Sequence, residues 1–179
     1  MMNLQKECYT TNKIGFIMNK GILIFITFLT IISSGQSFSA RCSISTTGIN
    51  FGVYNPLNAA PLDSNGTVTI RCQRRGKDNS TSGYVDLYPD SGSGGSCNSP
   101  RILSGGSSSL QYNIYMDASR STVWCWNGSS GTGWQSFNFS DLTPPVSQTY
   151  TAYGRIFGSQ TSATPGTYTQ TIWARVEYN

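Results

Sequence analysis

The chain has 179 residues, and 12 lysines and arginines against 8 acidic residues give it a formal net charge of +4. Histidine is absent, which removes the commonest general base and excludes every Ser-His or Cys-His catalytic arrangement. Charged residues make up only 11% of the chain and aromatic residues 12%, while glycine, serine and threonine are abundant. This composition favours a turn-rich β domain over a helical one.

The N-terminal region has the order of a secretory signal. A basic Met18-Asn19-Lys20 segment precedes an apolar run over residues 21–32, and a polar stretch with small side chains follows. The run has 12 residues, whereas a membrane-spanning helix needs about 20, so we expect export and no membrane span in the mature chain. Residues 1–17 precede a complete leader, and Met18 is therefore the expected start.

The leader is expected to end at Ser39. A cut there places small residues at Ser37 and Ser39, whereas a cut one residue later would put bulky Phe38 at the third position before the cleavage site. Residues 1–39 are therefore interpreted as an N-terminal extension and signal peptide. The remaining residues, 40–179, have the usual length of one domain, and we predict a single exported domain over that range.

Four cysteines follow the leader: Cys42, Cys72, Cys97 and Cys125. An even number in an exported protein predicts two disulfides, because the periplasm and the cell surface are oxidising. A bridge between Cys97 and Cys125 would tether glycine-rich loops. A bridge between Cys42 and Cys72 would join the first two strands, yet the sequence leaves all three pairings open. Zinc is the rival interpretation, but a close Cys-x-x-Cys pair is missing, so no metal or cofactor is expected.

The exported chain carries nine basic and seven acidic residues, a charge of +2 that says little about partners. From residue 43 onward, short alternating or β-branched segments recur between clusters of glycine, proline, asparagine and serine. Their spacing predicts an all-β sandwich of two sheets. The predicted strands cover residues 42–47, 66–72, 83–88, 110–117, 150–156 and 166–178. The intervening stretches 90–99, 105–109 and 127–133 are predicted to be loops.

Alternation assigns side chains to faces in two of these strands. In the last strand, Ile172, Ala174 and Val176 share a mostly apolar face, while the residues between them share a mixed face. The apolar face is predicted to turn towards the core. A second alternating set is predicted to lie in the core: Leu110, Tyr112 and Ile114.

Several short blocks of residues follow one another in a specific order. The first are Cys42-Ser-Ile-Ser, Gly48-x-x-Phe51-Gly52-x-Tyr54-x-Pro56-Leu57 and Gly66-Thr-Val-Thr-Ile-Arg-Cys72. The later ones are Tyr112-Asn113-Ile114-Tyr115-x-Asp117, Thr122-Val123-Trp124, Tyr153-Gly154-Arg155-Ile156 and Pro165-Gly166-Thr167-Tyr168-x-x-Thr171-Ile172. In this order, the blocks resemble the spore coat protein U domain family over nearly the whole exported chain.

The resemblance implies a function outside the cytoplasm. Members of this family include spore coat components and subunits of archaic chaperone/usher pili. It implies an incomplete, strand-accepting, immunoglobulin-like sandwich, into which a periplasmic chaperone and later a neighbouring subunit insert a strand. The strand 166–178 is expected to border the open groove. The implied product is a structural and adhesive pilus subunit that passes through the periplasm to the cell surface and supports attachment and biofilm formation.

The partners implied by the resemblance are a periplasmic pilus chaperone, an outer-membrane usher, neighbouring pilus subunits and a surface or carbohydrate receptor. The mature N-terminus departs from the pattern of a polymerising subunit. A donor strand needs about ten or more residues with alternating apolar side chains, yet only Ala40-Arg41 precedes Cys42. We therefore expect a subunit that accepts a strand without donating one, at the fibre tip. The alternatives are a self-contained secreted or spore coat structural protein and a carbohydrate-binding module.

Aromatic residues gather around the glycine-rich stretch 127–133. Trp126 and Trp134 are the candidate adhesive residues, because exposed rings make effective contacts with apolar or sugar surfaces. The alternative is that the aromatic side chains of this region fill the core of the sandwich.

Charged side chains offer weaker candidates. A basic cluster lies beside a turn and consists of Arg71, Arg74, Arg75 and Lys77. We expect it to be solvated, since no nucleic-acid-binding motif accompanies it. Two aspartate pairs are formal glycosidase candidates whose separation the sequence does not set: Asp86 with Asp90, and Asp117 with Asp141. We therefore expect neither an enzyme nor a nucleic-acid-binding protein.

Overall fold

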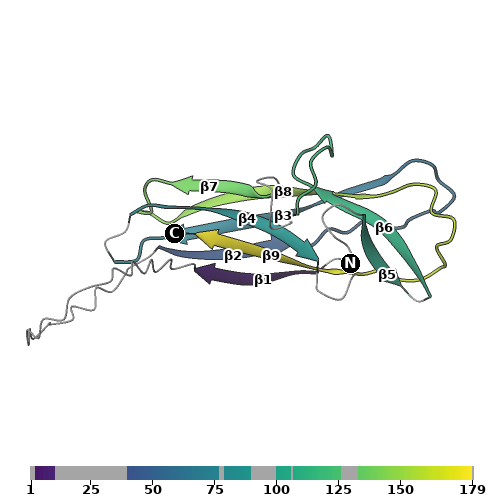
Figure 1. Ribbon diagram of the computed structural model, residues 1–179, viewed down its shortest axis with the longest axis horizontal. Helices are drawn as coiled ribbons and strands as arrows, with labels where there is room; N and C mark the ends of the chain where they lie inside the picture. The colour runs from purple at the N-terminus through teal and green to yellow at the C-terminus, as the bar shows by residue number, and fades with distance from the viewer. Residues whose placement is uncertain are drawn as a thin grey trace, which may run out of the picture.

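The computed structural model describes residues 3–10, 40–76, 79–89, 100–105, 107–125 and 133–178. These residues form two packed sheets and no helix (Figure 1). The described part of the chain therefore contains no helix that could span a membrane. The strands are β1 (Asn3–Thr10), β2 (Arg41–Thr47), β3 (Leu62–Gln73), β4 (Thr81–Pro89), β5 (Arg101–Gly105), β6 (Ser108–Tyr115), β7 (Gln135–Phe139), β8 (Val146–Ile156) and β9 (Thr171–Tyr178).

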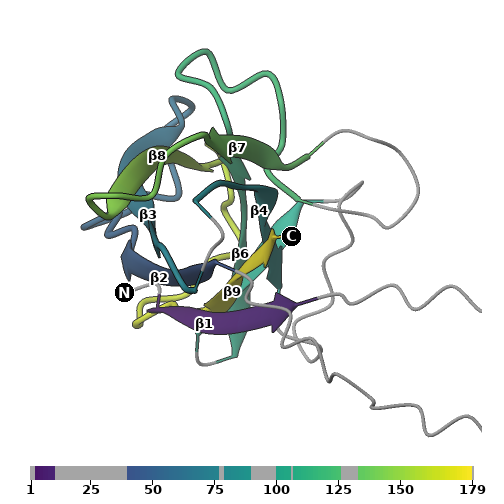
Figure 2. The same ribbon diagram turned by 90° about the vertical axis from the view of Figure 1, so that its left-hand side faces the viewer.

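The two sheets have different strand orders. One sheet has the order β1-β9-β4-β7, and the other has the order β2-β3-β8-β6-β5. β1 runs parallel to β9, whereas every other pair of neighbouring strands is antiparallel. Figure 2 looks along the sandwich and shows the two layers facing each other. The prediction of an all-β, immunoglobulin-like two-sheet sandwich is confirmed.

The core lies between the sheets and is filled by alternating side chains, as the period of a half-buried strand requires. In β3, Val68 and Ile70 are fully buried, and they belong to the same core cluster as Val85 and Leu87 of β4. The core side chains predicted for the strand at residues 110–117 are confirmed. Each is at most 2% exposed: Leu110, Tyr112 and Ile114.

All six predicted strands exist, with ends displaced by up to five residues. The stretch 105–109, predicted to be a loop, is instead the turn of a tight hairpin, since Gly105 ends β5 and pairs with Ser108 of β6. β5 and β7 were not predicted because each has only five residues, too few to establish an alternating pattern. The predicted loop 90–99 lies outside the described residues, as do residues 127–132.

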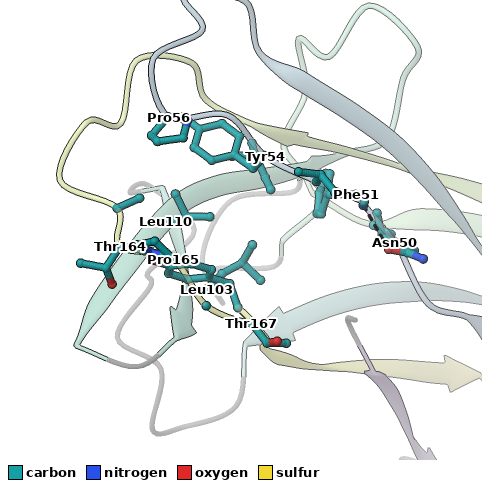
Figure 3. Close-up of a pocket in the computed structure, with 16 residues that line it drawn as sticks. Asn50, Phe51, Tyr54, Pro56, Leu103, Leu110, Thr164, Pro165 and Thr167 are labelled. Carbon is teal, nitrogen blue, oxygen red and sulfur yellow. Dashed lines mark hydrogen bonds between the residues drawn. The ribbon is translucent and has the colours of Figure 1, made fainter.

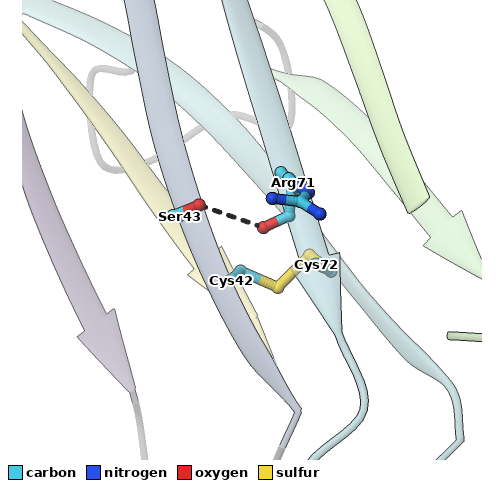
Figure 4. The surroundings of a disulfide bond; sticks show 4 residues. All are labelled: Cys42, Ser43, Arg71 and Cys72. Carbon is cyan, nitrogen blue, oxygen red and sulfur yellow. Dashed lines mark hydrogen bonds between the residues drawn. A yellow bond between two sulfur atoms is a disulfide. The ribbon is translucent and has the colours of Figure 1, made fainter. Parts of the chain in front are cut away.

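A disulfide joins Cys42 and Cys72, which face each other in the antiparallel register of β2 and β3 (Figure 4). Their Cα atoms are 4.0 Å apart. The next register pair adds a hydrogen bond, in which Ser43 Oγ donates to the carbonyl oxygen of Arg71 at 3.3 Å. The bridge therefore fixes β2 at the edge of its sheet.

Removing this bridge is expected to lower the free energy of unfolding. The closed loop spans 30 residues, for which the chain-entropy relation gives a loss of about 3–4 kcal/mol when Cys42 and Cys72 are both replaced by serine. Urea unfolding measures it. Ser45→Ala, an exposed change on the same strand, is the control and should stay within about 0.5 kcal/mol. Equal midpoints for the two variants would contradict this assignment.

Candidate functional site

β9 lies between β1 and β4 and presents a fully buried inner face. Ile172, Ala174 and Val176 are each 0% exposed, which confirms the predicted apolar face. The antiparallel pairing with β4 extends from Gly83, opposite Tyr178, to Pro89, opposite Ile172. One edge of β9 is therefore hydrogen-bonded to a strand that lies, like β9, within residues 40–179.

The other edge of β9 is paired with β1. The parallel register runs from Asn3 opposite Thr171 to Thr10 opposite Tyr178, so β1 matches β9 over the full length of both strands. β1 also contacts β2 of the opposite sheet, and both views show it beside these two strands (Figures 1 and 2). β1 thus closes the sandwich between β9 and β2. We call this location the β1 position.

A buried ion pair holds β9 on β4. Arg175 donates to both carboxylate oxygens of Asp86, from Nη2 at 2.7 Å and from Nε at 3.3 Å, and the Asp86 side chain is only 1% exposed. Arg175 also lies 3.2 Å from Glu177, which accepts a hydrogen bond from the Tyr84 hydroxyl. Burial raises the pKa of Asp86, and the hydrogen bond and charge of Arg175 act against that rise.

The pKa of Tyr84 is raised to about 12, first by burial and then by its hydrogen bond to Glu177. Tyr84 therefore remains a neutral donor at physiological pH.

The strands β4 and β9 approach closely at Gly83, where a Cβ atom would lie 2.0 Å from the carbonyl oxygen of Glu177. Only glycine fits this position without moving β9 away from β4.

A second buried cation ties the two sheets together near the start of β9. Arg101 of β5 is 1% exposed, and its Nη2 donates to the carbonyl oxygens of Leu87 at 3.2 Å and Trp124 at 2.7 Å. Burial lowers the pKa of Arg101. Alongside it, the Tyr112 hydroxyl donates to the side-chain oxygen of Gln170. Sequence reasoning missed this cluster, because backbone acceptors leave no side-chain pattern.

The aromatic candidates separate into buried and half-buried side chains. Trp124 is 0% exposed and donates from Nε1 to the Val85 carbonyl oxygen at 3.2 Å. Phe137 and Phe139 are also buried, so core filling accounts for these three rings. Trp134 is half-buried, and its ring lies 5.4 Å from that of Tyr84 on the outer side of the first sheet. Trp126 lies outside the described residues.

The remaining candidates form no metal site within the described ranges. Cys125 is disulfide-bonded, while Cys97 lies outside those ranges, as do Lys77 and Asp90. The Asp117 carboxylate accepts hydrogen bonds from the Ser119 hydroxyl and from the Ser121 and Thr122 amides in a surface turn, which lowers its pKa. The described arginines of the basic cluster, Arg71, Arg74 and Arg75, are exposed. No described group of three His, Cys, Asp or Glu side chains could hold a metal ion.

This geometry defines a class of protein: a two-sheet β domain in which a preceding N-terminal segment completes the first sheet. Residues 28–175 match the spore coat protein U domain. The chain belongs to the spore coat protein U domain family, which confirms the resemblance drawn from its sequence blocks.

A solved structure that resembles the chain is the pre-assembly complex of the chaperone CsuC with the tip adhesion subunit CsuE, from archaic chaperone-usher Csu pili of Acinetobacter baumannii. The sequence identity is 22% and the TM-score is 0.41. The match covers 78% of this chain but only 40% of the matched chain, so the present chain spans less than half the length of that relative. None of the curated proteins compared with the sequence matches it.

Replacing Arg175 by methionine is expected to destabilise the protein by about 3–5 kcal/mol, because the Asp86 carboxylate is left buried and unpaired. The double variant Asp86→Asn with Arg175→Met should lose less than the single one. Urea unfolding at neutral pH provides the measurement.

The matched control is Arg155→Met, because the Arg155–Asp63 pair has a similar distance of 2.8 Å but is 30% and 35% exposed. An exposed pair contributes at most about 1 kcal/mol. Equal losses for the two single variants would show that burial does not set the strength of the Asp86 pair.

Proposed function

We propose that the chain is a structural and adhesive subunit of a bacterial surface pilus, assembled by the chaperone/usher route through donor-strand complementation, rather than an enzyme. Membership of the spore coat protein U domain family supports this class. One observation carries the proposal: the strand that pairs with the outer edge of β9 is formed by residues 3–10. These residues precede the apolar run of the proposed leader.

Cleavage after Ser39 would remove β1 from the exported protein. β9 would then become an edge strand with a row of unpaired N–H and C=O groups, next to the inner face formed by Ile172, Ala174 and Val176. An added strand would pair those groups and cover the apolar strip, as in other cases of β-strand addition. The proposed donors are a periplasmic chaperone before assembly and a neighbouring pilus subunit within the fibre, with an outer-membrane usher mediating the exchange.

The residues of β9 that pair with β1 define which side chains a donor strand needs. Because three alternate residues of β9 are fully buried, a donor should carry apolar residues at the register positions opposite Ile172, Ala174 and Val176. A strand shifted by one residue would turn those side chains away from the core. The groove therefore selects a strand by the phase of its alternation.

The proposed place in the fibre is the tip. After cleavage at Ser39, Ala40 would be the first residue, and its side chain is only 4% exposed. β2 begins at Arg41, and Cys42 is bonded to Cys72, so this segment is already held in its own domain. The exported chain would have no free extension with which to fill another groove. Trp126 and Trp134 remain the proposed adhesive surface for attachment and biofilm formation.

The proposal is tested by expressing residues 40–179 in the periplasm with and without an archaic pilus chaperone, followed by size-exclusion chromatography. We expect soluble protein only as a one-to-one complex, because the strip along β9 is uncovered in the isolated domain. A second variant adds an Asn-Gly turn after the last residue and then an eight-residue strand that alternates threonine and valine. The strand begins with threonine, so that when it folds back antiparallel to β9 its valines lie opposite Val176, Ala174 and Ile172. This variant should be soluble and monomeric without a chaperone.

The matched control carries the same added strand shifted by one residue, so that threonine faces the core instead of valine. It should aggregate like the unextended domain. If residues 40–179 form a stable monomer without any added strand, the sandwich is complete and the strand-exchange proposal is wrong.

A self-contained secreted or coat protein is the second candidate, and the pairing of β1 with β9 is the observation that favours it. A chain that keeps residues 3–10 completes its own first sheet and needs no donor. The intact mass of the exported protein distinguishes the two. A chain starting at Ala40 supports the pilus subunit, whereas a chain that retains residues 3–10 supports the self-contained protein.

A further inference from the structure

A pocket of about 480 Å³ lies at the end of the sandwich where β2 ends and β9 begins, opposite the end that holds the Cys42–Cys72 disulfide. Its walls come from two loops, residues 49–56 and 163–168, and from the β5–β6 hairpin (Figure 3). The volume falls within the range of about 300–1,000 Å³ that small-molecule sites have in proteins.

The described lining combines apolar and aromatic side chains with uncharged polar groups, which include Asn50, Thr164 and Thr167. Among the described residues, no aspartate, glutamate, lysine or arginine contributes to the walls, so these walls offer a charged ligand no ionic partner for the hydration it would lose. The apolar surface comes mainly from Phe51, Tyr54, Leu103, Leu110 and Pro165. These walls favour an uncharged hydrocarbon group.

Hydrogen bonds hold the walls in place without a ligand. The Tyr54 hydroxyl donates to the carbonyl oxygen of Phe157 at 2.8 Å and accepts from the Gln160 amide at 3.1 Å. Ser104 and Thr169 exchange two backbone hydrogen bonds, at 3.1 and 2.9 Å, which attach the second loop to β5. A preformed site loses little conformational entropy when a ligand enters.

The mouth of the pocket combines a free hydroxyl with exposed apolar surface. Thr167 lines the mouth and is exposed, and its hydroxyl has no hydrogen-bond partner among the described residues. Val53, also part of the lining, is 94% exposed. A ligand with an apolar tail and one uncharged polar end would place its tail among the rings and its polar end near Thr167.

We propose that this pocket binds the hydrocarbon tail of a small, soluble, uncharged amphiphile, such as a medium-chain alcohol. The lining that the structure describes comes entirely from residues 49–168, which lie after the proposed cleavage site. The inference therefore concerns the domain proposed to be exported. It gives the domain a ligand site distinct from the aromatic surface around Trp134.

The test titrates 1-hexanol, 1-octanol and 1-decanol into the exported protein by calorimetry, using whichever form is soluble, the monomer or the chaperone complex. We expect one site per domain. Affinity should rise about fourfold for each added methylene group until the chain outgrows the cavity. No saturable binding by any of the three alcohols would overturn the proposal.

Two matched pairs of variants locate the binding. Ala163→Trp fills the pocket from a half-buried lining position, whereas Ser162→Trp adds the same ring at an exposed position outside it. We expect at least a tenfold loss of affinity for A163W and no change for S162W. Equal affinities for these two variants would place the alcohols elsewhere and overturn the assignment.

The second pair keeps the test valid if A163W does not fold. Val53→Lys puts a charge at the mouth, and Leu57→Lys puts the same charge on an 80% exposed residue of the same stretch that does not line the pocket. V53K should weaken octanol binding at least threefold relative to L57K. Identical affinities for V53K and L57K would contradict the proposed site.

Discussion

The structure depends on the backbone hydrogen bonding of one strand, β9. Its inner side chains are fully buried, so both of its edges need partners if the polar backbone is to be satisfied next to the core. β4 supplies one partner, and the contact is fixed by the close approach at Gly83 and by the buried Arg175–Asp86 ion pair. β1 supplies the other from a segment at the opposite end of the chain.

This asymmetry links the fold to the proposed function. The edge shared with β4 does not depend on cleavage, because both strands lie after the proposed cleavage site and the Arg175–Asp86 ion pair joins them. The edge shared with β1 depends on a segment that lies on the other side of the proposed cleavage site. A domain that is stable on one edge of its last strand and dependent on a partner at the other is suited to assembly by strand addition.

Local pattern was enough to predict the sheets, because alternation places Ile172, Ala174 and Val176 on one face wherever the strand ends. It could not predict β1, whose pairing is a long-range contact between the two ends of the chain. Arg101 was missed because its partners are backbone carbonyl groups of Leu87 and Trp124, which side-chain identity does not reveal. The pairing of Cys42 with Cys72 also required the strand register.

Amide hydrogen exchange of β9 tests the central claim most directly. The measurement compares residues 171–178 in the domain that begins at Ala40, refolded at low protein concentration before it aggregates, with the same residues after a donor strand is supplied. The account predicts that the amides on the β1 side of β9 exchange rapidly in the first state and become protected in the second, while β3 and β8 stay protected in both. Protection of every β9 amide in the isolated domain would mean that its sandwich is already complete.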